Sequence, residues 1–208
     1  MELILGLAIL VYSAILHEIA HGFVADRLGD PTARLMGRLT LDPHPHIDPL
    51  MSILLPLLLL FSGSPIIFGA AKPVPVDPFN LKEGRKDMAL VALAGPLTNI
   101  LLAIAATLIF RILDAVPILF PSFIGIFFYL VVQYNLLLAV LNLIPIPPLD
   151  GSKVFSMLLP EEQAARYLSL GQLGMFILFF LLLFPIGGLS IGSFISRLVT
   201  FGMTTLGF

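Results

Sequence analysis

Three ionisable residues stand inside an apolar stretch near the N-terminus. His17, Glu18 and His21 occur within five positions and follow the apolar run at residues 3–16. On an α-helix, positions i and i+4 lie about 40° apart around the axis and about 6 Å apart along it, so both imidazoles can reach one metal ion. Glu18 projects beside them, where its carboxylate can take a proton from a metal-bound water. The spacing predicts a site for metal-assisted hydrolysis.

The simpler explanation of this motif is a polar face on an ordinary helix. Ionisable groups within a membrane helix cost about 3 kcal/mol each, so each of them is expected to serve a function. A polar face would leave three such groups unexplained inside a hydrophobic helix. The sequence therefore favours a metal site.

Two histidines make an incomplete site, because catalytic zinc usually takes three protein ligands. The chain contains no cysteine, so the third ligand should be His, Asp or Glu. Asp150 is the best candidate, because three prolines precede it, at 145, 147 and 148, and unwind the end of the preceding helix toward a cavity. The alternative is that Asp150 caps the N-terminus of a helix near 152–159. The two roles are compatible.

The composition shows which solvent surrounds these residues. The chain has 208 residues, of which 58% are hydrophobic and 12% charged. A soluble domain carries about 25% charged residues, so the sequence predicts an integral membrane protein. A net charge of -2 without a basic tract excludes a nucleic-acid partner. Residues 3–16 also resemble a secretory signal, but Glu2 stands where a basic residue belongs, so we interpret them as a retained first span.

The predicted fold is an all-α, polytopic transmembrane bundle of five to six membrane segments. A span needs about 20 apolar residues. Together the segments form a single domain over 1–208, with a catalytic core at about 1–160 and C-terminal membrane segments at about 164–208. The last segment could instead lie in the membrane interface. The segments lie at about 3–25, 50–70, 88–113, 122–148, 168–185 and 186–208.

The segment at 50–70 is ambiguous because Pro56 and the Ser62 to Pro65 stretch interrupt it. A complete crossing would place His17 and Asp150 about 20–30 Å apart on opposite faces, whereas a re-entrant hairpin brings them to one depth. Basic residues favour the hairpin, because it leaves only Arg111 opposite nine others, whereas a crossing divides the same ten residues four to six. The prediction is a multi-pass protein of the cell membrane with its N-terminus outside and its site near the cytoplasmic face. The nine are Arg27, Arg34, Arg38, Lys72, Lys82, Arg85, Lys86, Lys153 and Arg166.

Three motifs together resemble the site-2 protease family of intramembrane zinc metalloproteases. Residues 17–22 (HEIAHG) resemble its helical zinc motif, and residues 142–151 (NLIPIPPLDG) resemble its second motif, in which an Asp before Gly completes the site. Residues 94–99 (AGPLTN) resemble the Gly-Pro motif of the span between them. Residues 37–49 and 69–80 resemble a compact prokaryotic subgroup without PDZ or CBS domains. The resemblance covers about residues 10–155.

The resemblance implies a role for each matching residue. His17, His21 and Asp150 would bind one zinc ion per chain, and Glu18 would activate water. Asn142 would hold the scissile carbonyl or oxyanion, and Asn99 is a weaker candidate for substrate contact. The substrate would be a membrane-spanning protein or peptide within the lipid bilayer. The chain departs from the family in its paired prolines before Asp150 and in the alanines at 70 and 71, where the subgroup often has Trp.

The polar loops offer further candidates. His44 and His46 could be extra ligands or gating groups, but the prolines flanking His44 favour an interfacial loop. Residues 34–41 and 72–76 alternate like short edge strands, which could form β-hairpin-like loops and pair with an extended substrate.

Two other functions compete with proteolysis. A metal transporter or metal sensor could use the same His and Asp residues as a transit site, but it would need polar residues that continue to the opposite face. The runs at 3–16 and 100–110 contain almost none. An inactive homologue acting as a binding scaffold would not need all four site residues intact. The sequence makes no prediction of an oligomeric state.

Overall fold

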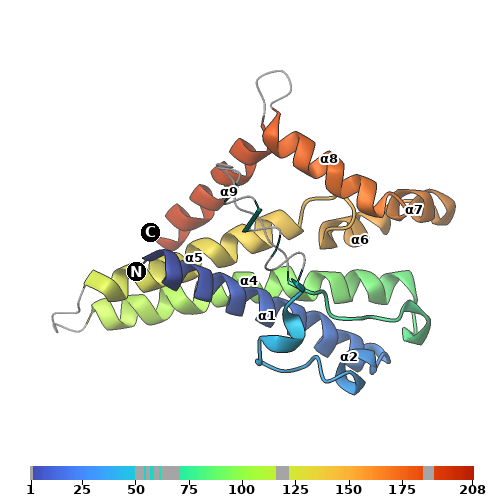
Figure 1. Cartoon of the computed structure of the whole chain (residues 1–208), viewed down its shortest axis with the longest axis horizontal. Coiled ribbons are helices and arrows are strands. Elements are labelled where there is room, and N and C mark those ends of the chain that lie inside the picture. The colour runs from blue at the N-terminus through green and yellow to red at the C-terminus, as the bar shows by residue number, and fades with distance from the viewer. Residues whose placement is uncertain are drawn as a thin grey trace.

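The computed structural model describes residues 2–49, 71–115, 122–184 and 190–208, together with the isolated positions 54, 57, 58 and 61. Over these residues the regular secondary structure is entirely helical (Figure 1). Three of the described helices are long and apolar enough to cross a membrane: α1 (Glu2–Leu28), α4 (Arg85–Asp114) and α5 (Ser122–Asn142). At 1.5 Å per residue each is at least about 30 Å long, which matches a hydrocarbon core. The prediction of an all-α fold with helices long enough to span a membrane is confirmed for the described residues.

Small residues let these three helices approach one another closely. In a membrane, helices associate mainly through close packing and polar contacts, so interfaces favour Gly, Ala and Ser. α4 packs along both α1 and α5, and α1 also contacts α5 (Figure 1). The buried small residues of α1 and α4 are Gly6, Ser13, Gly22, Ala25, Ala89, Ala92, Gly95, Ala103 and Ala106.

α1 and α4 run antiparallel. Ser13 of α1 lies beside Asn99 of α4, and His21 lies beside Val91, so residue numbers rise along one helix as they fall along the other. The end of α1 and the beginning of α4 are therefore at the same end of the bundle. A hydrogen bond of 2.8 Å from the Lys72 amide to the His46 carbonyl also joins the two flanks of the segment predicted to be re-entrant. Most of residues 50–70 lies outside the described residues, so the hairpin itself stays a prediction.

The helix α5 ends at Asn142, and residues 143–149 form no regular helix before α6 (Asp150–Ser156) begins. This is the unwinding that the three prolines predict, because proline cannot continue a helix. Leu149 is the N-cap of α6 and Asp150 is its first residue, with a carboxylate that contacts His17, His21 and Lys153. The capping alternative for Asp150 is therefore wrong.

The C-terminal part is shorter than the sequence predicts. α7 (Glu161–Leu168) meets residues Leu173–Leu182 of α8 (Gly171–Leu183) at an angle of 67°, so the two helices form at most one broken span. α9 (Ile191–Leu206) is only 16 residues long. It packs on α5 through Ile195, Val199 and Met203. Within the described residues there are three candidate spans, or four with the bent pair, so the count of five to six is not confirmed.

The two segments expected to be edge strands form no strand. Arg34 and Leu35 belong to α2 (Thr32–Leu35), residues 36–41 form turns and bends, and residues 72–76 have no regular secondary structure. Pro73 and Pro75 explain the second failure, because proline has no N–H for a ladder. Short 3-10 helices, η1 (His44–His46) and η3 (Pro78–Asn80), complete the loops around the end of α1.

Candidate metal centre

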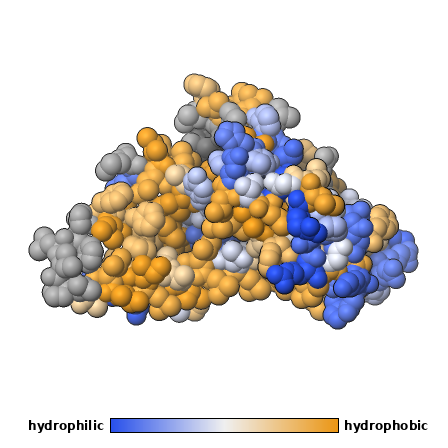
Figure 2. Space-filling view, turned by 90° about the horizontal axis from the view of Figure 1, so that it is seen from below, coloured by the Kyte–Doolittle hydropathy of each residue, from blue (hydrophilic) through white to orange (hydrophobic). Residues whose placement is uncertain are grey.

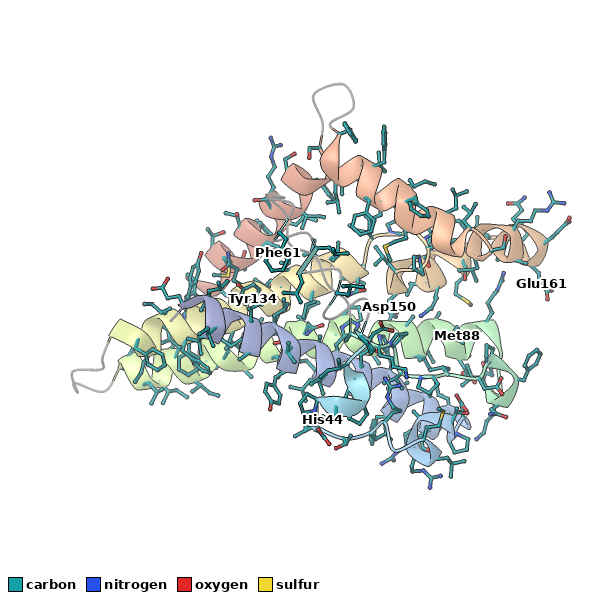
Figure 3. The ribbon with its side chains drawn as sticks, in the orientation of Figure 1. His44, Phe61, Met88, Tyr134, Asp150 and Glu161 are labelled. Atoms are coloured by element: carbon teal, nitrogen blue, oxygen red, sulfur yellow. The ribbon has the colours of Figure 1, made fainter. Side chains whose placement is uncertain are left out.

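His17, His21 and Asp150 meet in the interior, although 129 positions separate His21 from Asp150 in the sequence. The Nε2 atoms of both histidines lie 3.1 Å from Oδ2 of Asp150. The three residues are buried, and one ligand atom from each lies within 4.8 Å of the others. Figure 3 shows Asp150 beside the middle of the α1 and α4 ribbons. The described chain contains no other cluster of three or more potential ligands.

The donor set and its spacing fit zinc. Zinc binds His nitrogen and carboxylate oxygen at about 2.0–2.2 Å, usually with tetrahedral geometry. Tetrahedral ligands at that distance lie about 3.4 Å apart, close to the 3.1 Å between each Nε2 and the Asp150 oxygen. Two imidazoles and one carboxylate leave a fourth position for water or substrate, as catalytic zinc sites require.

Both histidines are held through Nδ1, which leaves Nε2 for the metal. His21 Nδ1 lies 2.7 Å from the carbonyl oxygen of Val91, and His17 Nδ1 lies 2.6 Å from Oδ1 of Asn99. Each contact requires Nδ1–H to donate, so the lone pair is on Nε2. Such partners set the orientation and tautomer of ligand histidines.

The unwound segment after α5 positions Asp150. Gly151 lies so close to this segment that a Cβ on it would be 2.2 Å from the Leu143 carbonyl oxygen. Only glycine permits that approach, which brings the first turn of α6 against the segment. On its other side, Asp150 Oδ1 accepts a hydrogen bond of 3.1 Å from Lys153 Nζ. One carboxylate oxygen thus faces the histidines, while the other is held by the ammonium group of Lys153.

Glu18 lies beside the two histidines and is half-buried. Its Oε2 accepts a hydrogen bond of 2.7 Å from the backbone N–H of Val74. Among the described residues, this is the hydrogen bond that fixes the carboxylate. It holds the carboxylate in place beside the histidines.

The loop that carries Val74 is fixed at both ends. Arg38 donates from Nη2 to the carbonyl oxygens of Lys72 and Pro73, at 2.8 and 3.2 Å. At the other end, the buried Asp30 accepts hydrogen bonds from the Asp77 amide and from Asn80. These contacts hold the backbone N–H of the loop over Glu18.

Asp30 remains ionised in this position. Burial alone would raise its pKa, but hydrogen bonds from Thr32, Asn80 and the Asp77 amide outweigh burial, so the pKa lies below its ordinary value. Its negative charge strengthens every hydrogen bond that it accepts, and the loop is held at neutral pH.

A cavity of about 430 Å³ opens beside the site, a volume typical of small-molecule and peptide subsites. Its polar lining consists of His17, Glu18, His21, Asn142, Asp150 and Lys153. The remaining lining is mostly aliphatic, from Leu10, Val91, Leu138, Leu141, Met175 and Leu178. An apolar peptide segment would therefore meet a chemically matched surface.

The two asparagines named from the sequence occupy different environments. Asn142 lines the cavity, and its Nδ2 donates 3.1 Å to the Leu138 carbonyl one turn back. Asn99 is fully buried, is absent from the cavity lining and contacts His17 instead. The geometry thus brings Asn142 to the open side of the site and places Asn99 behind His17.

His44 and His46 do not join the metal cluster. His44 is exposed, and its Nδ1 lies 2.6 Å from Asp42 Oδ1. His46 is buried, and its Nε2 lies 3.0 Å from the Thr40 carbonyl. Both contacts are local, which agrees with the interpretation as an interfacial loop.

The sequence did not predict the residues that support the site through hydrogen bonds. The Val74 amide donates to Glu18, Lys153 donates to Asp150, and Arg38 donates to the Lys72 carbonyl. Hydropathy does not encode such contacts. Asn135 could have been found, because a polar side chain inside an apolar span is a functional candidate by default. It stands seven positions before Asn142, which is two turns along one helix face.

Gly95 provides a test of the packing behind His17. A Cβ built on Gly95 would lie 2.4 Å from His17 Nε2, so the imidazole would have to move. We expect Gly95→Ala to weaken zinc binding at least about tenfold, measured by competition with a chelator. The matched control is Gly125→Ala on α5, where an added Cβ meets nothing within 4 Å. Equal zinc affinity in the two variants would contradict the packing argument.

Comparison with known proteins identifies similar sequences across most of the chain. A family model described as Peptidase family M50 matches residues 119–185. The Bacillus subtilis protein named "Putative zinc metalloprotease YwhC" is 35% identical over 182 residues, which cover 86% of this chain and 80% of that protein. Two mycobacterial proteins share the name "Putative zinc metalloprotease Rip2". The Mycobacterium tuberculosis protein is 39% identical over 74% of this chain and 57% of its own length. The Mycolicibacterium smegmatis protein is 33% identical over 88% of this chain and 68% of its own length. No solved structure matches.

Proposed function

Because the chain belongs to peptidase family M50, the site-2 protease family, and is a zinc metalloprotease, we propose that it cleaves peptide bonds within or next to membrane-spanning segments of its substrates. The observation that carries this proposal is the position of the cluster formed by His17, His21 and Asp150, which lies inside a bundle of apolar helices beside a mostly aliphatic cavity. A substrate segment that is itself apolar suits this surface.

Each site residue has a proposed role. His17, His21 and Asp150 hold one zinc ion, which supplies Lewis acidity to the scissile carbonyl and to the attacking water when it is bound. Glu18 accepts the proton of that water and passes it to the leaving amine, while the Val74 amide keeps its carboxylate in place.

Asn142 is proposed to bind the scissile carbonyl. Its amide lines the cavity beside Asp150, so an N–H of Nδ2 can donate to a carbonyl oxygen that becomes negative during the reaction. For Asn99 we propose a role behind the metal instead of substrate contact, because its side chain orients His17 and is closed off from the cavity. The transporter alternative loses its support, since the family assignment already accounts for the His and Asp ligands.

We further propose that the site lies near the cytoplasmic face, with the N-terminus outside. Hydrophilic residues gather at the end of the molecule that carries α2 and the beginning of α4, and hydrophobic residues dominate the opposite end (Figure 2). Basic residues of the polar end include Arg27, Arg34 and Arg85, whereas Arg111 lies near the other end, where it contacts the Leu206 carbonyl. This asymmetry follows the positive-inside rule.

The orientation can be tested with reporter fusions. A reporter enzyme fused after residue 82 is expected to report a cytoplasmic position, as is one fused after residue 160. A fusion after residue 115 is expected to report an external position and is the internal control. An external signal from residue 82 would show that either the re-entrant segment or the orientation with the N-terminus outside is wrong.

The proposed function itself can be tested in proteoliposomes. The purified protein is reconstituted with a single-span substrate carrying a tag at each end. Cleavage should require zinc, stop when a chelator removes the metal and resume when zinc is restored. Failure of the zinc-loaded protein to cleave any of a panel of single-span substrates, while it cleaves a soluble peptide, would contradict the assignment to membrane segments.

A further inference from the structure

A chain of buried polar side chains runs from His17 through all three spanning helices. Oδ1 of Asn99 on α4 accepts from His17 Nδ1 at 2.6 Å. Nδ2 of Asn99 donates to Oδ1 of Asn135 on α5 at 2.8 Å, and Nδ2 of Asn135 donates to the Ser13 hydroxyl on α1 at 2.9 Å. The exposed fractions of Asn99, Asn135 and Ser13 are 0%, 1% and 5%, so water does not compete for these contacts.

Backbone carbonyls fix the direction of every hydrogen bond in this chain. Nδ2 of Asn135 also faces the Val131 carbonyl at 2.9 Å, and Nδ2 of Asn99 also faces the Ser13 carbonyl at 3.4 Å. A carbonyl oxygen only accepts, so the amide nitrogen of each asparagine must be the group that faces it. Oδ1 of Asn135 is then turned toward Asn99, and Oδ1 of Asn99 toward His17.

The direction of the chain determines where His17 carries its proton. Oδ1 of Asn99 is an acceptor, so His17 Nδ1 must be protonated in order to donate to it. The lone pair of the neutral imidazole is then on Nε2, which lies 3.1 Å from Oδ2 of Asp150, so a metal ion between the two atoms could bind both. The opposite tautomer would put a proton on Nε2, where it would block the metal, and would leave two acceptors facing each other at Nδ1. An unmade contact at a buried polar group costs about 1–3 kcal/mol.

We propose that Asn135 is a positioning residue that acts through Asn99 to hold His17 in the tautomer that binds zinc. Asn135 does not touch the metal ligands, yet its amide sets the orientation of the Asn99 amide. Ser13 supports it from α1, and the Val131 carbonyl alone can still orient Asn135 when the hydroxyl is absent. This inference rests on the proposed role of His17 as a zinc ligand.

The two histidines differ in how their tautomers are fixed. His21 donates directly to the Val91 carbonyl, a backbone group that no substitution removes. His17 depends on two side chains on two other helices. A change at Asn135 should therefore weaken the Nδ1–H hydrogen bond of His17 and leave that of His21 unchanged, which a general loss of packing would not do.

The test uses the full chain with three substitutions. Asn135→Leu removes the hydrogen-bond acceptor and the donor of the amide and keeps a side chain of similar volume. We expect zinc affinity to fall about tenfold or more, measured by chelator competition. Ser13→Ala should have a smaller effect, because the Val131 carbonyl still orients Asn135. The matched control is Thr107→Val, which removes a buried hydrogen bond from Thr107 to the Ala103 carbonyl on α4 without touching the chain to His17, so its zinc affinity should equal that of the wild type.

A second readout requires no metal, substrate or turnover. Nitrogen NMR of the metal-free protein with labelled histidine is expected to show the Nδ1–H of His17 hydrogen-bonded in the wild type and that hydrogen bond weakened in Asn135→Leu, with His21 unchanged. A wild-type His17 without a proton on Nδ1 would overturn the proposal even if every variant failed to fold. Equal zinc affinity and an equally strong Nδ1–H hydrogen bond in wild type and Asn135→Leu would also overturn it. Absence of proteolysis with these NMR and affinity results intact would count against the proposed function alone.

Discussion

Replacing Glu18 with Gln is expected to reduce cleavage of a single-span substrate by about 10²- to 10⁴-fold, the usual contribution of a general base. Gln has nearly the same shape, and its Oε1 can still accept the 2.7 Å hydrogen bond from the Val74 amide. It cannot accept the proton of the attacking water. Because Glu18 is not among the three clustered ligands, zinc content should stay near the wild-type value. Cleavage and bound zinc are measured on the same preparations.

Glu162→Gln is the matched control for this substitution. Glu162 is an exposed residue of α7, where it pairs with Arg166, so losing its charge should change neither cleavage nor zinc. Retained cleavage in Glu18→Gln would remove Glu18 from the role of base. A loss of zinc in the same variant would make Glu18 a metal ligand instead.

Replacing Asp150 with Ala is expected to lower zinc affinity by more than the ten- to hundredfold that follows loss of an outer hydrogen-bond partner. The substitution removes one of three ligands, and two imidazoles are an incomplete catalytic zinc site. It also leaves Lys153 without its partner carboxylate, so an unpaired positive charge remains near the metal position. Cleavage should be lost together with bound zinc, and the metal content of the purified variant measures the first effect.

Asp114→Ala serves as the control for Asp150→Ala. Asp114 is an exposed acidic residue at the far end of α4, so its loss should leave zinc and cleavage unchanged. Normal metal content and activity in Asp150→Ala would contradict the three-ligand site. Leu149, not Asp150, is the N-cap of α6, so the substitution removes no helix cap.

The metal site could be predicted because its residues conflict with their surroundings. His17, Glu18 and His21 are expensive in an apolar helix, and the prolines before Asp150 cannot continue one, so both features mark places where function overrides local preference. The structure brings His17, His21 and Asp150 together as the sequence predicts, and it ends α5 at Asn142. The roles of these residues stay proposals until the variants are measured.

The surrounding contacts were not predictable, because they depend on packing between segments that are distant in sequence. The sequence does not show whether Asn99 faces a substrate or a histidine of the cluster. The antiparallel pairing of α1 and α4 turns it toward His17. Residues 72–76 alternate like a strand, but their amide groups pair with His46 and Glu18 instead of a neighbouring strand. Their prolines were a signal against a strand.

The C-terminal segments are less regular than predicted for a different reason. Hydropathy measures how long an apolar stretch is and cannot detect a bend within it. Gly171 adopts a positive φ of 26° at the start of α8, and α7 and α8 consequently meet at a sharp angle. α9 is apolar enough to enter a membrane, yet its 16 residues span only about 24 Å. α9 packs on α5, and α8 contributes Met175 and Leu178 to the cavity lining.

The central claim is that this zinc site hydrolyses a peptide bond inside a membrane segment, and mapping the cut bond by mass spectrometry tests it most directly. Zinc-loaded wild-type protein is reconstituted with a single-span substrate, and the products are compared with those of Glu18→Gln and of chelator-treated wild type. We expect one or a few cuts within or next to the span in the wild type and none in the two controls. Cuts confined to parts of the substrate remote from the membrane, or the same cuts in Glu18→Gln, would contradict it.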